Sequence, residues 1–151
     1  MNKFKDIIQP VNAAVADKKG TTKFYIADAA ADNSNSLVNY RDNIHNEYTV
    51  QLLTVDDFVF ENEIKLSFLK IDAEGAELSV LKGARRVLSE QRPICILAMH
   101  PKSIRKFGDS NEAIWDYICA LNYRILRGNQ KMEKMGFCNN SELFDVHLLP
   151  T

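Results

Sequence analysis

The sequence lacks the features that mark several specialised classes of protein. Its three cysteines, Cys95, Cys119 and Cys138, show no C-x-x-C spacing, so we predict neither a zinc site nor a disulfide framework. No apolar stretch is long enough to cross a bilayer, and the N-terminus lacks the apolar segment of a signal peptide. We therefore expect a cytoplasmic protein without a membrane span.

An excess of charge of one sign is also missing. The chain has 19 Lys and Arg residues against 20 Asp and Glu residues, a formal net charge of −1, and no long basic block. Because proteins that bind nucleic acid or acidic lipid usually carry a basic patch, we expect neither as a partner. A length of 151 residues with 46% hydrophobic residues is ordinary for one globular domain, so we expect a single domain over residues 1–151.

The first half of the chain has the pattern of strands and loops. Residues 11–17 and 21–28 are strand candidates that flank Lys-Lys-Gly, which predicts a short hairpin. Small and polar residues over 29–36 indicate a loop, and residues 47–53 form another strand candidate. Thr54, followed three residues later by Asp57, is typical of a helix start.

The second half alternates strands and helices more clearly. The apolar run from Leu66 to Asp72 predicts a buried parallel strand covered on both faces, and the apolar spacing from Ala76 predicts a helix that Pro93 ends. The next expected elements are a strand over 94–99, a helix capped by Asp109 or Ser110, and strands over 123–126 and 143–149. The helix should bury one stripe of residues: Ile114, Trp115, Ile118, Cys119 and Leu121. This order predicts an α/β domain with a mostly parallel sheet and an antiparallel C-terminal strand.

Polar residues follow two of the expected strands directly. Asp72, Glu74 and Glu77 come after the first, and His100 comes after the second. In open parallel sheets, ligands bind beyond the carboxyl ends of the strands, so neighbouring strands would bring these side chains to one crevice. The same residues also fit a structural explanation, in which the carboxylates cap the helix or interact with its dipole. The spacing alone leaves both interpretations open.

The segment around these residues resembles a known family. "FLKIDAEGAELSVLKGARRVL", followed by "RPICILAMHP", resembles the C-terminal half of the FkbM-family methyltransferases, whose hallmark is K-I-D-x-E-G-A-E, then L-x-G-A, then a proline-led strand ending in H-P. The matching positions are Lys70, Ile71, Asp72, Glu74, Gly75, Ala76, Glu77, Leu81, Gly83, Ala84, Pro93, His100 and Pro101. Such a long match in one block is specific.

The resemblance implies a partial class I methyltransferase (Rossmann-like) fold, S-adenosylmethionine as methyl donor and a small-molecule hydroxyl as acceptor. It implies catalytic roles for Asp72, Glu74 and His100, with Asp72 closest to the methyl donor and Glu74 or His100 as base or substrate contact. It also places Ala14 beside the adenine and assigns no metal.

The family's opening strand and Gly-rich cofactor loop have no counterpart here, since no two of the six glycines are spaced as G-x-G. We therefore expect the strand from Leu66 to Asp72 to be covered by the chain's own N-terminal strand, a second copy or a partner chain. Two other functions stay open. One is a non-catalytic remnant or subunit of a methyltransferase assembly. The other is a metal-dependent hydrolase that uses Asp72, Glu74, Glu77 and His100.

Overall fold

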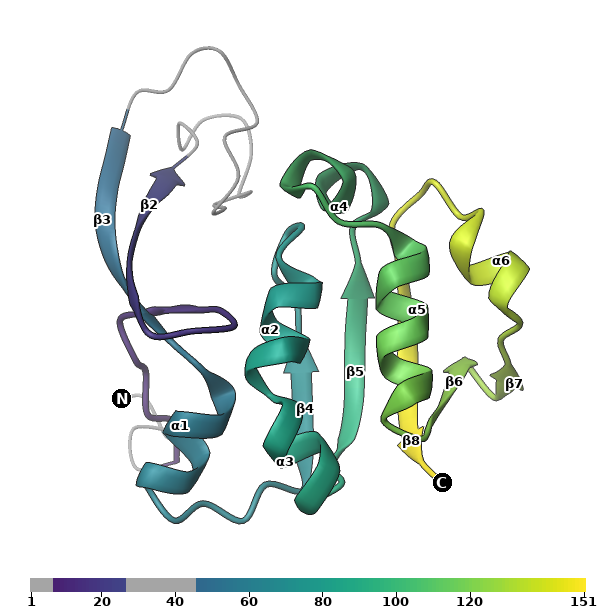
Figure 1. Ribbon diagram of the computed structural model, residues 1–151, viewed down its shortest axis with the longest axis horizontal. Coiled ribbons are helices and arrows are strands. Elements are labelled where there is room, and N and C mark those ends of the chain that lie inside the picture. Colours follow the sequence, from purple (N-terminus) through teal and green to yellow (C-terminus); the bar gives the residue numbers. More distant parts are fainter. Residues whose placement is uncertain (1–6, 27–45) are drawn as a thin grey trace.

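Alternating strands and helices build two β-sheets that lie side by side (Figure 1). The computed structural model describes residues 7–26 and 46–151. The strands are β1 (Ala14–Val15), β2 (Gly20–Ile26), β3 (Asn46–Leu53), β4 (Phe68–Ile71), β5 (Ile94–Met99), β6 (Tyr123–Arg127), β7 (Gln130–Lys131) and β8 (Phe144–Pro150). The helices are α1 (Val55–Glu61), α2 (Glu77–Gly83), α3 (Arg85–Glu90), α4 (Pro101–Phe107), α5 (Asn111–Ala120) and α6 (Lys134–Cys138). The α/β class is confirmed.

The smaller sheet has three strands in the order β1-β3-β2. β3 pairs with β1 in parallel and with β2 in antiparallel orientation. The predicted hairpin between residues 11–17 and 21–28 is wrong, because β3 lies between the two strands and takes up their hydrogen bonds. The predicted helix start is confirmed, since the Thr54 side chain accepts a hydrogen bond from the Asp57 N–H at 2.9 Å. The loop predicted over 29–36 lies outside the described residues.

The larger sheet has five strands in the order β4-β5-β8-β6-β7. Only β4 and β5 pair in parallel, and the other three pairs are antiparallel. The prediction of a mostly parallel sheet is therefore wrong, because β8 returns between β5 and β6 and removes a parallel pairing there. The predicted antiparallel C-terminal strand is confirmed as β8.

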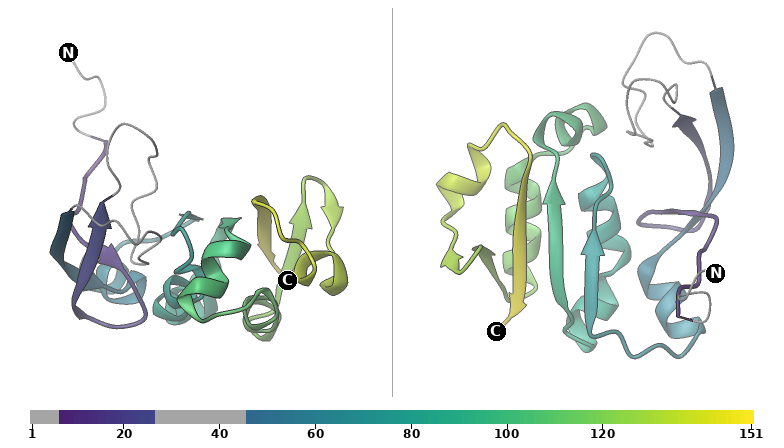
Figure 2. Two further views of the ribbon diagram at one scale, coloured as in Figure 1. Left: turned by 90° about the horizontal axis from the view of Figure 1, so that it is seen from above. Right: turned by 180° about the vertical axis from the view of Figure 1, so that it is seen from behind.

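Helices α2, α3 and α5 cover one face of the larger sheet, and the view from behind shows its strands in front of them (Figure 2). The core lies between this helical layer and the sheet, and includes Leu81, Leu88, Leu97, Ile114, Ile118 and Val146. The expectation that β4 is covered on both faces is wrong, because the Phe68 side chain is 51% exposed and Lys70 is also exposed. In the view from behind, none of the described helices lies over the second face of β4 (Figure 2).

The helix predicted from Ala76 forms as two consecutive helices, α2 and α3, with Ala84 between them. Its predicted apolar residues are all buried: Val80, Leu81, Ala84, Val87 and Leu88. α2 comes very close to the chain that follows β1, since a Cβ added at Gly83 would lie 2.0 Å from the Ala16 carbonyl oxygen. This close approach joins the two sheets.

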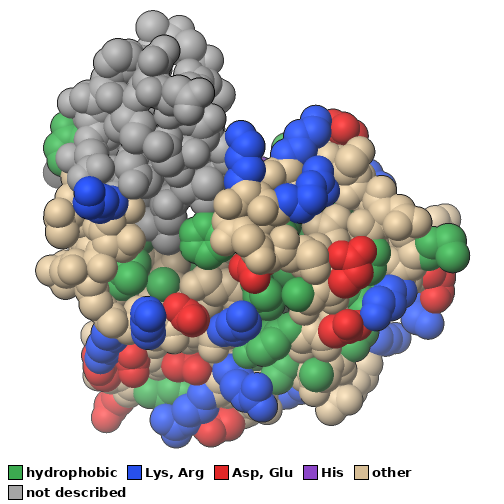
Figure 3. Space-filling model, turned by 45° about the horizontal axis from the view of Figure 1, so that its top comes forward, with side chains coloured by type: hydrophobic (Ala, Val, Ile, Leu, Met, Phe, Trp, Pro, Cys, Tyr) green, Lys and Arg blue, Asp and Glu red, His purple; other side chains and the backbone are tan. Residues whose placement is uncertain are grey.

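The helix after residue 109 is confirmed as α5, with Ser110 as its N-cap at 3.1 Å from the Ala113 N–H. Its stripe buries Ile114 and Ile118 fully, whereas Cys119 is exposed against expectation. None of the helices formed by the described residues is long and apolar enough to cross a bilayer. Basic and acidic side chains intermingle over the described part of the face drawn in Figure 3.

Candidate functional site

The carboxyl ends of β4 and β5 form the edge where the predicted site residues meet. The two strands pair in parallel with Ile71 opposite Leu97, so the polypeptide leaves both strands at the same edge of the sheet. Asp72 follows β4 directly, and His100 follows β5 as the N-cap residue of α4. The structure therefore confirms the geometric expectation that these two strand ends are neighbours.

A tight turn brings Glu74 to the same place. Glu74 has a φ of 48° and Gly75 a φ of 112°, both in a region that L side chains rarely adopt. A Cβ at Gly75 would also lie 2.8 Å from the Ser103 Cβ on α4, so only glycine fits there. This strained turn reverses the chain between β4 and α2 and directs the Glu74 carboxylate towards His100.

Glu77 contacts the imidazole of His100 and fixes its position. Its side chain is fully buried at the start of α2, and Oε1 accepts a hydrogen bond from the Gly75 N–H at 3.0 Å. The same oxygen lies 2.7 Å from Nδ1 of His100, and we assign the proton of that contact to Nδ1. Sequence reasoning linked Glu77 to the helix dipole and missed this contact, because a buried partner 23 residues away leaves no local pattern.

The other ring nitrogen of His100 faces the two remaining carboxylates. Nε2 lies 3.3 Å from Glu74 Oε1 and 3.6 Å from Asp72 Oδ1. The hydrogen bond to Glu77 raises the pKa of His100 most strongly, and the charges of Glu77, Glu74 and Asp72 raise it further, while burial lowers it. The imidazole is only 11% exposed, whereas the Asp72 and Glu74 carboxylates are 45% and 36% exposed.

Lys70 places a basic side chain against this cluster. Its ammonium donates a hydrogen bond to Asp72 Oδ2, the oxygen that does not face His100. This hydrogen bond is the main reason that the pKa of Lys70 is raised. Asp72 is therefore oriented from one side by a lysine and presents its second oxygen to the imidazole.

Ala14 belongs to the smaller sheet, whereas the three predicted catalytic residues follow strands of the larger sheet. It sits half-buried in β1 and lines a cavity of about 400 Å³ together with Asn12, Thr49 and other residues of the smaller sheet. Among the described residues that line it, none is Asp72, Glu74 or His100. The size is within the range of small-ligand sites.

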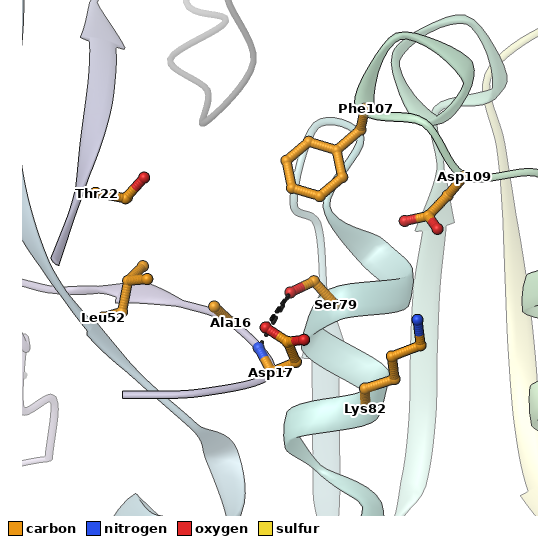
Figure 4. A pocket seen from close by; sticks show the side chains of 8 residues that line it. All are labelled: Ala16, Asp17, Thr22, Leu52, Ser79, Lys82, Phe107 and Asp109. Carbon is orange, nitrogen blue, oxygen red and sulfur yellow. Dashed lines mark hydrogen bonds between the residues drawn. The ribbon is translucent and has the colours of Figure 1, made fainter. Parts of the chain in front are cut away.

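A second cavity, of about 300 Å³, lies between the smaller sheet and α2 (Figure 4). Lys82 comes from α2 and Asp109 from the turn after α4, while Asp17 and Ser79 are joined by a hydrogen bond from the Asp17 N–H to Ser79 Oγ at 3.0 Å. Sequence reasoning did not find this cavity, because its walls come from segments that only the close packing at Gly83 brings together.

Comparison with protein families identifies a related domain. The model of the methyltransferase FkbM domain matches residues 4–125, which is most of the chain. Comparison with the curated proteins and with the solved structures gives no significant match.

Proposed function

The chain belongs to the FkbM methyltransferase family, and on this premise we propose that it transfers a methyl group from S-adenosylmethionine to a hydroxyl of a small molecule. The observation that carries the proposal is the meeting of Asp72, Glu74 and His100 where β4 and β5 end. A hydroxyl acceptor must lose its proton during the transfer, and this cluster offers carboxylate oxygens that solvent and substrate can reach.

Each residue of the cluster has a role in this proposal. Glu74 accepts the proton of the acceptor hydroxyl, a contribution that is typically about 10²–10⁴-fold in rate. His100 contacts the acceptor, and the buried Glu77 fixes the ring in place. Asp72 lies on the side of the methyl donor. When bound, S-adenosylmethionine supplies an electrophilic methyl group on a sulfonium centre.

For the cofactor, we propose that the cavity beside Ala14 takes the nucleoside. Asp72 is not among the described residues that line this cavity.

The outer edge of β4 supports a second proposal, that a strand of another polypeptide pairs with it. Among the described strands, β4 pairs only with β5, and β1, which was one expected neighbour, pairs with β3 instead. An apolar cavity of about 270 Å³ lies beside this edge, lined by Val15, Leu66, Leu69 and other residues. Open apolar edges promote pairing with another chain, and a second copy of this chain is the first candidate. Light scattering of the purified protein tests this, and a stable monomer at all concentrations would contradict pairing with a second copy.

Release of S-adenosylhomocysteine from S-adenosylmethionine tests the proposed reaction. The assay needs a panel of hydroxyl compounds that includes sugars, polyketides and lipids. We expect acceptor-dependent release by the wild type and a loss of about 10²-fold or more in the Glu74→Gln variant. The Glu142→Gln variant, which changes an exposed carboxylate elsewhere, should match the wild type. Cofactor binding without release for any acceptor would favour a non-catalytic subunit instead.

A further inference from the structure

We propose that Asp72, Glu74 and His100 bind a divalent cation. One ligand atom from each residue can be chosen so that all three lie within 4.8 Å of one another. Cation binding follows from the geometry of these side chains and does not depend on methyl transfer. Only the use of the cation, to hold the oxygen of the acceptor, rests on the proposed function.

The distances within the cluster match those between neighbouring ligands of one metal ion. Nε2 of His100 is 3.3 Å from Glu74 Oε1 and 3.6 Å from Asp72 Oδ1. Ligand atoms that each lie about 2.0–2.2 Å from a metal are separated by roughly 3.0–3.6 Å in octahedral or tetrahedral geometry. The two contacts of Nε2 therefore fit one shared cation, and the carboxylates, placed so that all three ligand atoms lie within 4.8 Å of one another, would close on the ion.

Glu77 gives an independent reason to expect a ligand at Nε2. Histidines that bind metals usually donate their other ring N–H to a carboxylate, which fixes the orientation of the ring. Glu77 is fully buried, and its Oε1 lies 2.7 Å from Nδ1 of His100. Its other oxygen, Oε2, has no hydrogen-bond partner among the described residues. A buried carboxylate costs several kcal/mol unless positive charge lies close by, and either a protonated His100 or a cation bound at Nε2 supplies that charge.

The direction of the Nε2 lone pair points to the same conclusion. If Nδ1 carries the proton, the lone pair of Nε2 faces carboxylate oxygens of Asp72 and Glu74, so three acceptors converge on one point. Lys70 does not fill that point, because it bonds Asp72 Oδ2 on the other side of the carboxylate.

The ligand types indicate which cation fits. Two carboxylates and one imidazole suit Mn²⁺, Fe²⁺ or Zn²⁺ better than Ca²⁺, which prefers oxygen ligands alone. Asp72 and Glu74 are partly exposed, so the ion would keep coordination positions open to solvent. An acceptor with an oxygen donor could occupy those positions, in which case the cation, rather than Glu74 directly, would hold the reacting hydroxyl.

Titration of Mn²⁺ into the chelator-treated full chain tests the proposal without cofactor or acceptor. Binding is measured as the decrease of the electron paramagnetic resonance signal of free Mn²⁺. We expect one Mn²⁺ per chain with a Kd below about 1 mM. Glu74→Gln should weaken binding by about tenfold or more, and Glu77→Gln by about 10–100-fold through the freed imidazole. The matched control Glu142→Gln should bind like the wild type.

Pulsed electron paramagnetic resonance spectra distinguish Mn²⁺ bound to a histidine nitrogen from Mn²⁺ bound to surface carboxylates alone. Nitrogen coupling to the bound Mn²⁺ should be present in the wild type and lost in His100→Gln, with circular dichroism confirming that both fold. Absence of stoichiometric Mn²⁺ below about 1 mM, unchanged binding in Glu74→Gln, or bound Mn²⁺ without nitrogen coupling would each overturn the proposal. Mn²⁺ binding without cofactor binding would leave it standing and would count against the proposed function alone.

Discussion

Replacing Gly83 by alanine should destabilise the protein, although glycine-to-alanine changes in helices usually stabilise. Gly83 is the last residue of α2 and faces the chain that follows β1. A Cβ there would lie 2.0 Å from the Ala16 carbonyl oxygen, whereas ordinary contacts begin at 3.4 Å. The two backbones would have to separate by about 1.4 Å, the shortfall between 2.0 and 3.4 Å.

The size of the effect follows from three contributions. Overpacking at a backbone contact costs about 1–3 kcal/mol. The same separation would break the 3.0 Å hydrogen bond between the Asp17 N–H and Ser79 Oγ, which adds about 1 kcal/mol. The smaller backbone entropy of alanine returns about 0.5–1 kcal/mol. We expect a net loss of about 1–3 kcal/mol in the free energy of unfolding.

Gly136→Ala is the matched control. Gly136 lies inside α6, and a Cβ there would meet nothing within 4 Å. This variant should gain about 0.5–1 kcal/mol. Urea unfolding followed by circular dichroism measures both, and the melting temperature of Gly83→Ala should fall by several degrees. A Gly83→Ala variant as stable as Gly136→Ala would refute the close approach of α2 to β1.

Three further predictions concern stability and thiol reactivity. Arg92 donates three hydrogen bonds to backbone carbonyls after α5 and at Thr151. Arg92→Lys should therefore lower the free energy of unfolding in urea by about 1–3 kcal/mol, and an unchanged urea midpoint of unfolding would contradict this. Burial raises the pKa of the Cys95 thiol to about 12, whereas Cys119 is exposed. A disulfide reagent at about pH 8 should therefore modify Cys119 in the native protein and Cys95 only in denaturant. Rapid labelling of Cys95 in the native protein would contradict its burial. Thr54→Ala removes the cap of α1 and should cost about 1 kcal/mol in the same unfolding assay, a loss that Thr54→Ser should largely avoid.

Local patterns predicted the elements whose causes are local. The apolar spacing of Val80, Leu81 and Val87 indicated a helix, and these residues are buried against the sheet. The Thr54 cap and the alternation of β8 were equally readable. α4 was missed although Pro101 at its start and Gly108 at its end, with a φ of 95°, are typical helix boundaries. That signal was present in the sequence.

Pairings between distant segments were harder to predict. The expected hairpin failed because β3, which begins only at Asn46, pairs with both strands. The expected parallel sheet failed because β8 enters between β5 and β6. At the site, Asp72, Glu74 and His100 were predicted together and lie together. The role of Glu77 depends on a buried contact with His100, which no spacing reveals.

Calorimetric titration of the purified chain with S-adenosylhomocysteine, after measurement of its mass in solution, tests the proposed methyltransferase function most directly. We expect binding in the micromolar range, weakened by Asp72→Asn and unchanged by Asp116→Asn, which alters an exposed carboxylate on α5. Absence of binding at about 1 mM ligand would contradict it, because a methyltransferase that cannot hold its methyl donor cannot use the cluster at the ends of β4 and β5.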